Sequence, residues 1–250
     1  MSSPDMQDEE LLRYSRQIML PDVDIAGQEA LRAAHVLILG VGGLGSPAAL
    51  YLAAAGIGRL TLVDHDTVDL SNLQRQVVHD TNSVGQTKVE SAQARLQAIN
   101  PHCQIDVVDR KLDAQALHQL LAHVDLALDC TDNFSSRFLL NDLCWDTGTP
   151  LVSGAAIGWE GQITVFDPNR EDSPCYRCLY PSGDDAALNC AENGVIAPLV
   201  GIIGTSQAME ALKLIVGVGS PAVGRVMCYD AKYMEWRSLI LKPRAECRCR

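Results

Sequence analysis

The chain lacks the excess of positive charge that binders of anionic polymers carry. Lysine and arginine account for 20 of its 250 residues, aspartate and glutamate for 31, and the net charge at pH 7 is −11. Proteins that bind DNA, RNA or an anionic membrane surface need clustered positive charge. The balance argues against nucleic acid and membranes as partners, although it leaves room for a local basic pocket.

The chain also lacks an uninterrupted apolar run and a secretion signal. Its most apolar stretch, 195–218, is broken by Gln207, Glu210 and Lys213, whereas a bilayer span needs about 20 predominantly apolar residues. We therefore predict a buried helix there. Residues 1–10 are polar and acidic and have neither the basic start nor the apolar stretch of a signal peptide. We expect a cytoplasmic protein whose nine cysteines are thiols or metal ligands.

Apolar segments alternate with helical patterns through the first 160 residues. Short apolar runs predict strands at 35–40, 59–64, 104–108, 125–130 and 150–153. Such alternation indicates βαβ units around a mostly parallel sheet. Further along, apolar residues alternate as in antiparallel strands at 162–166, 225–229 and 235–242. The prediction is an α/β fold with one continuous mixed sheet, flanked by helices, in which antiparallel strands extend the parallel half.

A glycine turn follows the first predicted strand. The sequence Gly-Val-Gly-Gly-Leu-Gly starts at Gly40 and has the G-x-G-x-x-G spacing of Rossmann-like folds. There Gly40 would permit the tight turn, Gly42 would let the backbone approach a ligand, and Gly45 would let helix and strand pack closely. Asp64 ends the next strand, 24 residues after Gly40, where an acid commonly holds ribose hydroxyls. We predict an adenosine nucleotide site. A tight turn without a ligand is the alternative. Asp66 could be a turn residue, and we prefer Asp64 because it directly ends the apolar run.

Two cations follow at positions from which they could reach one polyphosphate. Arg75 lies in the segment 69–76, just past the second strand, and Lys88 starts the next predicted helix. Fixed positive charges neutralise the leaving group in phosphoryl or adenylyl transfer. The alternative is a solvated loop with an ordinary arginine and lysine. Asp132, after the fourth strand, could hold Mg²⁺ together with phosphate oxygens, or Asp132 or Asn133 could cap the following helix.

Two close cysteine pairs suggest a metal site. Cys175 and Cys178 form a C-x-x-C, and Cys247 and Cys249 lie near residue 250. Four thiolates make a closed, tetrahedral, structural Zn²⁺ site. A redox C-x-x-C is the less favoured alternative, because no thioredoxin-like βαβ start precedes it.

The other cysteines divide into two kinds. Cys103, Cys130, Cys144 and Cys228 fall in apolar elements, so we predict that they lie in the core. Cys190 lies in a long polar loop, where a small apolar thiol has no packing reason to be. It is therefore a candidate nucleophile.

Motifs occur in a characteristic order along nearly the whole chain. They are R-Y-S-R-Q at 13–17, G-V-G-G-L-G at 40–45, D-L-S-N-L-Q-R-Q at 69–76, D-C-T-D-N at 129–133, V-S-G-A-A-I at 152–157, E-G-Q-I-T-V-F at 160–166, C-Y-R-C-L at 175–179 and A-P-L-V-G-I-I-G-T at 197–205. With them the chain resembles the bacterial adenylyltransferases related to ubiquitin-activating enzymes. The resemblance implies one domain, 1–250, with an N-terminal helical arm (1–34), a nucleotide-binding half (35–160) and a half for carrier and zinc binding (161–250).

The resemblance implies a reaction and its residues. ATP and Mg²⁺ meet the C-terminal glycine carboxylate of a ubiquitin-like sulfur carrier, which attacks the α-phosphate to give an acyl-adenylate and pyrophosphate. The implied ATP contacts are Gly43, Asp64, Ser71, Asn72, Leu73, Gln74, Arg75, Lys88, Asp132 and Asn133, with Gln76 nearby. Asp132 would also bind Mg²⁺, and Arg16 would act on the neighbouring subunit of a homodimer. Cys190 matches a loop cysteine that takes up the carrier or sulfur in some relatives.

The chain departs from the family at its last cysteines. The family usually closes its zinc site with a second C-x-x-C, whereas this chain has Cys247-Arg-Cys249. The site could be strained, could use three cysteines with another ligand, or could be metal-free. No rhodanese-like sequence is present, so we expect a separate protein to donate the sulfur.

Two other functions and two branches of the family stay open. An NAD-dependent oxidoreductase would use the glycine turn and Asp64 but would leave Arg75, Lys88 and Asp132 without roles. A non-catalytic docking protein would not need those residues either. Within the family, 152–157 and 160–166 resemble the molybdopterin branch, while 235–239 leans toward the thiamine branch.

Overall fold

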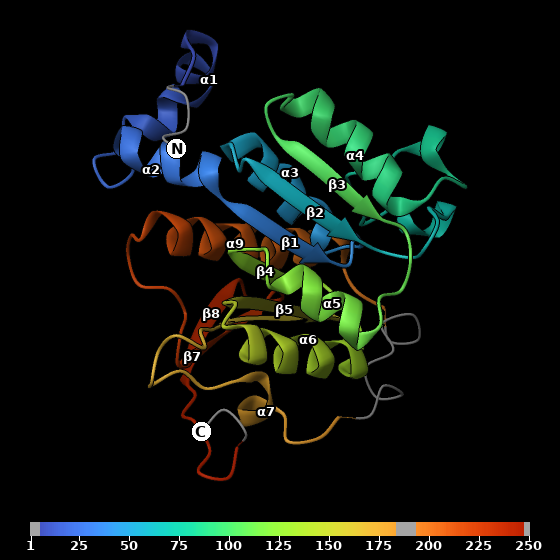
Figure 1. Cartoon of the computed structure of the whole chain (residues 1–250). Coiled ribbons are helices and arrows are strands. Elements are labelled where there is room, and N and C mark those ends of the chain that lie inside the picture. The colour runs from blue at the N-terminus through green and yellow to red at the C-terminus, as the bar shows by residue number, and fades with distance from the viewer. Residues whose placement is uncertain (1–5, 184–193, 248–250) are drawn as a thin grey trace.

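The structure is a computed structural model that describes residues 6–183 and 194–247. Within these ranges the strands form one eight-stranded sheet in the order β3-β2-β1-β4-β5-β6-β7-β8 (Figure 1). The strands are β1 (His35–Leu39), β2 (Arg59–Val63), β3 (Gln104–Val108), β4 (Leu126–Asp129), β5 (Leu151–Ile157), β6 (Glu160–Phe166), β7 (Arg225–Asp230) and β8 (Glu235–Ile240). Neighbouring strands are parallel from β3 to β5 and antiparallel from β5 to β8. The predicted continuous mixed sheet is confirmed.

Helices cover both faces of this sheet. They are α1 (Asp8–Ile18), α2 (Asp24–Ala33), α3 (Gly45–Ala55), α4 (Lys88–Ile99), α5 (Ala114–Leu121), α6 (Phe134–Thr147), α7 (Tyr176–Leu179) and α9 (Ala197–Val216), with 3-10 turns η1 (Leu70–Asn72) and η2 (Thr81–Ser83). Side chains of a strand alternate between faces. In β1, Ile38 joins the core beneath α3, α4 and α9, and Leu37 joins the core beneath α5 and α6 (Figure 1). Both faces of β1 are therefore buried and apolar.

The long apolar stretch forms the single helix α9. By length and composition it could cross a membrane. One side of it is buried, however, and Leu199, Ile203 and Ala211 belong to the same hydrophobic core as α3. The prediction of a buried helix is confirmed.

Strand β5 is longer than its sequence predicts. It continues past residue 153 to Ile157 and pairs with β6 along its whole length. The predicted end was wrong because glycine and alanine, here at 154–156, have low strand propensity. Glycine is needed at 154, because an added Cβ would lie 2.5 Å from the side chain of Gln207.

The cysteines follow the predictions in part. Cys103, Cys130 and Cys144 are buried, as predicted, and burial raises the pKa of the Cys103 thiol to about 12. The prediction was wrong for Cys228, which is half-buried on β7. Alternate residues of an antiparallel strand face opposite sides, so an apolar run does not place every member in the core. Cys190 and Cys249 lie outside the described residues.

Candidate functional site

The glycine turn joins the end of β1 to the start of α3. Gly40 has a φ of +92°, and a Cβ on it would lie 2.7 Å from the carbonyl oxygen of Cys130. A Cβ on Gly45 would collide with the carbonyl of Gly40 itself. Glycine accepts the positive φ at 40 without strain, and glycine at 45 allows the close approach to Gly40. At Gly40 the turn also passes close to the loop after β4. The space above the turn stays open for a ligand.

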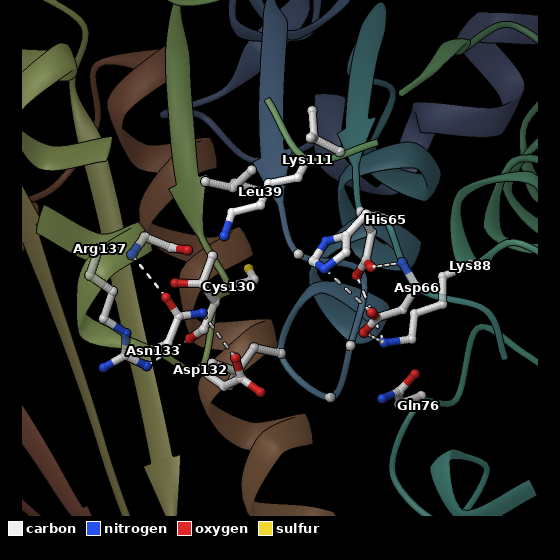
Figure 2. A pocket seen from close by; sticks show the side chains of 18 of the residues that line it. Leu39, His65, Asp66, Gln76, Lys88, Lys111, Cys130, Asp132, Asn133 and Arg137 are labelled. Carbon is white, nitrogen blue, oxygen red and sulfur yellow. Dashed lines mark hydrogen bonds and ion pairs between the residues drawn. The ribbon is translucent and has the colours of Figure 1, made fainter. Parts of the chain in front are cut away.

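A cavity of about 520 Å³ lies beyond the carboxyl ends of the parallel strands (Figure 2). This volume and this edge of an α/β sheet are typical of small-molecule sites. Its lining carries the side chains of five cations, Arg75, Lys88, Arg110, Lys111 and Arg137. A chain of net charge −11 thus concentrates positive charge at one place, which suits a polyanionic ligand. We call this space the glycine-turn cavity.

Most, but not all, of the ATP-site residues predicted from the sequence line this cavity. The lining includes Gly43, Asp64, Arg75, Lys88, Asp132 and Asn133, and also Gly42 and Gln76. Gln76 is buried, and its Oε1 has no hydrogen-bond partner among the described residues. A buried acceptor left without a donor costs free energy unless a ligand or water supplies one. This oxygen therefore fits a ligand that donates a hydrogen bond.

Asp64 is fixed at the end of β2. Its Oδ2 accepts a hydrogen bond of 2.7 Å from the backbone N–H of Val41, and its Oδ1 accepts one of 3.0 Å from that of Asp66. Because each carboxylate oxygen has a second lone pair, both can still accept bonds from hydroxyl groups. The carboxylate is thus oriented in advance, as the spacing from Gly40 predicts.

Lys88 has a carboxylate partner that the sequence analysis did not identify. Its Nζ lies 2.7 Å from Asp66 Oδ2 and 4.0 Å from Asp64 Oδ2 (Figure 2). Burial alone would raise the pKa of Asp66, but the hydrogen bond and charge of Lys88 hold it below its ordinary value. Asp66 is therefore more than a turn residue, because it holds the ammonium group at the cavity.

In the loop after β4, the neighbouring residues Asp132 and Asn133 have different roles. Asn133 caps α6, since its Oδ1 accepts a hydrogen bond of 2.9 Å from the backbone N–H of Ser136. Asp132 is exposed at the cavity, and its Oδ1 accepts only a 3.3 Å bond from Asn133 Nδ2 among the described residues. Of the two caps that the sequence allowed, Asn133 is the one used. The Asp132 carboxylate remains available for a cation.

A buried polar network supports this loop from below. Asp129 Oδ1 accepts hydrogen bonds from the N–H and hydroxyl of Thr131, and its Oδ2 accepts one from Ser153. Arg137 Nη2 donates to the Thr131 carbonyl at 2.7 Å, and its Nε lies 4.0 Å from Asp129 Oδ2. Burial disfavours the charged guanidinium, but the Asp129 carboxylate keeps the pKa of Arg137 raised. Arg137 lines the cavity as well, and the sequence analysis missed it.

The remaining predicted residues of the first half lie outside the cavity lining. Residues 71–74 form or follow the turn η1, which Asp69 stabilises by accepting hydrogen bonds from the Ser71 N–H and hydroxyl. Arg75 Nη1 donates to the Ser71 carbonyl at 3.2 Å. The turn therefore supports Arg75 at the cavity. Arg16 lies on α1 and also does not line it.

Three of the four predicted metal ligands lie together. The sulfur of Cys175 is 3.9 Å from that of Cys178 and 3.2 Å from that of Cys247. A tetrahedral Zn²⁺ with Zn–S bonds of about 2.3 Å separates its sulfurs by about 3.8 Å. The backbone N–H of Arg244 also approaches Cys178 Sγ at 3.4 Å, which favours a thiolate there. The Cys175–Cys178 separation matches that value and the Cys175–Cys247 separation is shorter, so the three sulfurs lie close enough together to share a metal ion.

A second cavity, of about 450 Å³, opens on the antiparallel strands. We call it the sheet groove. Its polar lining includes Glu160, Gln162, Tyr180, Cys228, Asp230 and Arg237. It shares Asp132, Arg137 and Ala156 with the glycine-turn cavity. The two spaces therefore meet beside Asp132.

A family model and several relatives match the chain over nearly its whole length. The model of the ThiF family matches residues 14–250. The chain belongs to the ThiF family. It is 52% identical to the molybdopterin-synthase adenylyltransferase of Escherichia coli, over 97% of both chains. It is 45% identical to the ThiS adenylyltransferase of the same organism, a sulfur-carrier enzyme by name, over 97% of this chain and 96% of the other.

Solved structures extend the ThiF-family comparison to the fold. The crystal structure of E. coli MccB with ATP has a TM-score of 0.82 and 22% identity, over 95% of this chain and 73% of MccB. At that identity the likeness concerns the fold alone. The resemblance inferred from the motifs is confirmed.

Proposed function

We propose that this ThiF-family chain is an enzyme that adenylylates the C-terminal glycine carboxylate of a ubiquitin-like sulfur carrier. ATP would supply the adenylyl group, and the products would be a carrier acyl-adenylate and pyrophosphate. The observation that carries the proposal is the cavity itself. The glycine turn follows β1 and Asp64 follows β2. Lys88 and Asp132 lie on opposite sides of the same cavity (Figure 2). The adenylyltransferase names of the relatives support the same reaction.

The substrate carboxylate is itself the nucleophile. Its oxygen forms a bond to the α-phosphorus while the bond from that phosphorus to the α–β bridging oxygen breaks, and the electron pair leaves with pyrophosphate. No proton has to move, so the protein must orient the reactants and absorb charge. Lys88 and Arg75 are suited to the phosphates. Lys88 keeps a counter-charge, Asp66, which fixes where its ammonium lies before ATP arrives.

The donor set at Asp132 fits a magnesium ion. Mg²⁺ prefers hard oxygen ligands and binds through one or two carboxylates plus substrate phosphates. Asp132 offers one exposed carboxylate at the cavity. The ion would neutralise phosphate charge in the reaction. Residues 71–74 and Asn133 are proposed as further ATP contacts.

The sheet groove suits the tail of the carrier. It meets the glycine-turn cavity at Asp132 and Arg137, so an extended tail lying in it would end beside the phosphates. Its lining offers both charged and hydrogen-bonding groups, among them Arg237 and Gln162. We propose this groove as the path of the carrier's C-terminus.

Several features of the proposal concern the assembly. We propose a homodimer in which Arg16 reaches the partner's phosphates, a structural zinc held by Cys175, Cys178, Cys247 and Cys249, and a separate sulfur donor. Cys190 remains a candidate acceptor for the carrier or for sulfur. We expect the enzyme to act in the cytoplasm.

ATP–pyrophosphate exchange with each of two carriers tests the reaction and its branch. The higher identity to the molybdopterin-synthase enzyme, 52% against 45%, favours exchange with the molybdopterin-synthase small subunit. Exchange with only the thiamine carrier would keep the mechanism and reverse the branch. No exchange with either carrier, from folded protein with Mg²⁺, would contradict the proposal.

A further inference from the structure

Helix α1 is tied to the protein core by Tyr14, two residues before Arg16, and by Gln17, the residue after it. The Tyr14 hydroxyl accepts a hydrogen bond of 2.8 Å from Asn100 Nδ2. On the other side, Gln17 Nε2 donates to the carbonyl of Ala55 at 3.0 Å. Both contacts span long stretches of sequence, so they fix α1 on the folded domain.

Both bonds belong to a polar cluster at the C-terminal end of α3. This cluster supplies donors to the last carbonyls of the helix, which have no partners within it. Asn100 Nδ2 also donates to the Ala53 carbonyl at 2.7 Å, and Gln28 Nε2 donates to that of Ala55 at 3.0 Å. Asn100 and Gln28 are both fully buried. Gly56, at a φ of +92°, makes room, because a Cβ there would lie 2.6 Å from Gln28 Nε2. Buried polar groups that are fully hydrogen-bonded are costly to displace, so this cluster is a rigid anchor.

Arg16 itself is left outside the anchor. Its side chain is exposed and forms no hydrogen bond or ion pair with any residue that the structure describes. It lies on the same helix face as Leu12, four residues before it, and Met19, three residues after it. Those two side chains are 76% and 70% exposed. An exposed cation between exposed apolar side chains suits contact with another protein surface.

Arg16 is too far along the fold to serve its own cavity. The cavity lies at the Gly45 end of α3, whereas Gln17 binds Ala55 at the other end. A helix of 11 residues separates those ends by roughly 15 Å. Figure 1 shows α1 on the side of the sheet away from the carboxyl end of β1. Arg16 can therefore complete only a cavity in another molecule.

We infer that Tyr14, Gln17, Gln28 and Asn100 are positioning residues that hold Arg16 outward for the glycine-turn cavity of a second copy of this chain. The inference rests on the proposed action of Arg16 between subunits. A misplacement of a charged group by about 1 Å can cost up to about 100-fold in rate. The four residues would therefore affect catalysis in a cavity that they do not touch.

Gln17→Met tests this, because methionine keeps the length of the side chain but removes the amide. We expect carrier-dependent ATP–pyrophosphate exchange to fall by about tenfold or more. The matched control is Ser15→Ala. The Ser15 hydroxyl donates only within α1, to Leu12, so that variant should keep its activity. Tyr14→Phe, which removes one oxygen, is the milder second variant should Gln17→Met fold poorly.

Mixing subunits distinguishes positioning from general damage. Gln17→Met would be combined with Lys88→Ala, which has an intact arm but a defective cavity. If subunits exchange freely in a symmetric dimer, one site in each hybrid is intact, and about a quarter of the wild-type activity should return. A Gln17→Met protein that is merely unstable would give no such recovery.

Three other outcomes would overturn all or part of the inference. Full activity of Gln17→Met and Tyr14→Phe would show that the anchor does not matter to catalysis. Mixing Arg16→Ala with Lys88→Ala could restore activity while mixing Gln17→Met with Lys88→Ala does not. That result would reject the positioning residues but keep the action of Arg16 between subunits. If neither mixture recovers, although subunit exchange is demonstrated, the action of Arg16 between subunits fails and the inference fails with it.

Discussion

The two halves of the sheet place their polar side chains differently. Between β3 and β5 the strands are parallel, and the cavity residues come from the loops beyond their carboxyl ends. From β5 to β8 the strands are antiparallel, and the polar residues of the sheet groove lie mainly on the strands. Gln162, Cys228 and Arg237 form one such row across β6, β7 and β8.

The difference separates two tasks. In the parallel half two cavity side chains have local partners that fix them, the backbone N–H of Val41 for Asp64 and the carboxylate of Asp66 for Lys88. Such preorganisation is what charge stabilisation in a reaction requires. The row on the antiparallel half offers a broad surface, which suits recognition of an extended tail. Changes in the first half should therefore impair the reaction, and changes in the second should impair carrier binding.

Asp132→Ala should have the largest effect on the reaction. It removes the proposed Mg²⁺ ligand, and the loss of several kcal/mol of charge stabilisation corresponds to about 1,000-fold in rate. The side chain is exposed, so the free energy of unfolding should change little. ATP–pyrophosphate exchange and urea unfolding measure the two quantities. Near-wild-type exchange would remove Asp132 from the mechanism.

Arg137→Met should have the largest effect on stability. It leaves the Asp129 carboxylate, which is fully buried, without its cation, at a cost of about 3–5 kcal/mol in the free energy of unfolding. Arg59→Met is the matched control. It breaks the exposed ion pair with Asp106 and should cost less than about 1 kcal/mol. Adding Asp129→Asn to Arg137→Met should restore part of the stability. Equal effects of Arg137→Met and Arg59→Met in urea unfolding would contradict the buried network.

Arg237→Ala tests the other half of the comparison. Arg237 lines the sheet groove, so the loss of its side chain should raise the KM for the carrier by about tenfold, as for a hydrogen bond to a charged group. The KM for ATP should not change. Lys232→Ala, an exposed cation in the turn between β7 and β8 that does not line the groove, is the control. A change in the KM for ATP alone would contradict the assignment of tasks.

Sequence patterns predicted the first half of the site better than the second. Asp64 and Asp132 could be found because a strand end is visible as the end of an apolar run. Arg110 and Lys111 follow β3 and could have been found by the same rule. Arg137 was missed because an arginine in a helical pattern is usually exposed, whereas here it is buried against Asp129.

The groove residues could not be predicted in the same way. Gln162, Cys228 and Arg237 become neighbours only through the register of β6, β7 and β8, which join segments far apart in the chain. Periodicity shows that each strand alternates, but it does not give the register or the face that a helix leaves open. The core prediction for Cys228 was wrong for this reason.

The smallest expected effect concerns His79. The test compares a histidine at each end of β1. His79 is buried beneath the glycine turn, within hydrogen-bond distance of the Val41 carbonyl and Ser91 Oγ. Burial lowers its pKa, and the charge of Lys88 adds to this, although the Val41 carbonyl opposes it. The unfolded chain binds the proton more readily, so this contribution to stability is present above about pH 6.5. It is lost as the pH falls toward the lowered pKa.

His79→Gln should therefore flatten the dependence of the unfolding free energy on pH between about 7 and 5. His35→Gln, at the amino end of β1, is the control. Burial lowers its pKa too, and its ring contacts the His123 carbonyl and Thr61. Both substitutions should flatten the stability profile, but only His79→Gln should also remove a rise in the KM for ATP at acid pH, because only His79 touches the glycine turn. If the His35 substitution removes the rise in the KM for ATP at acid pH instead, the effect of acid arises from the whole sheet and not from the cavity.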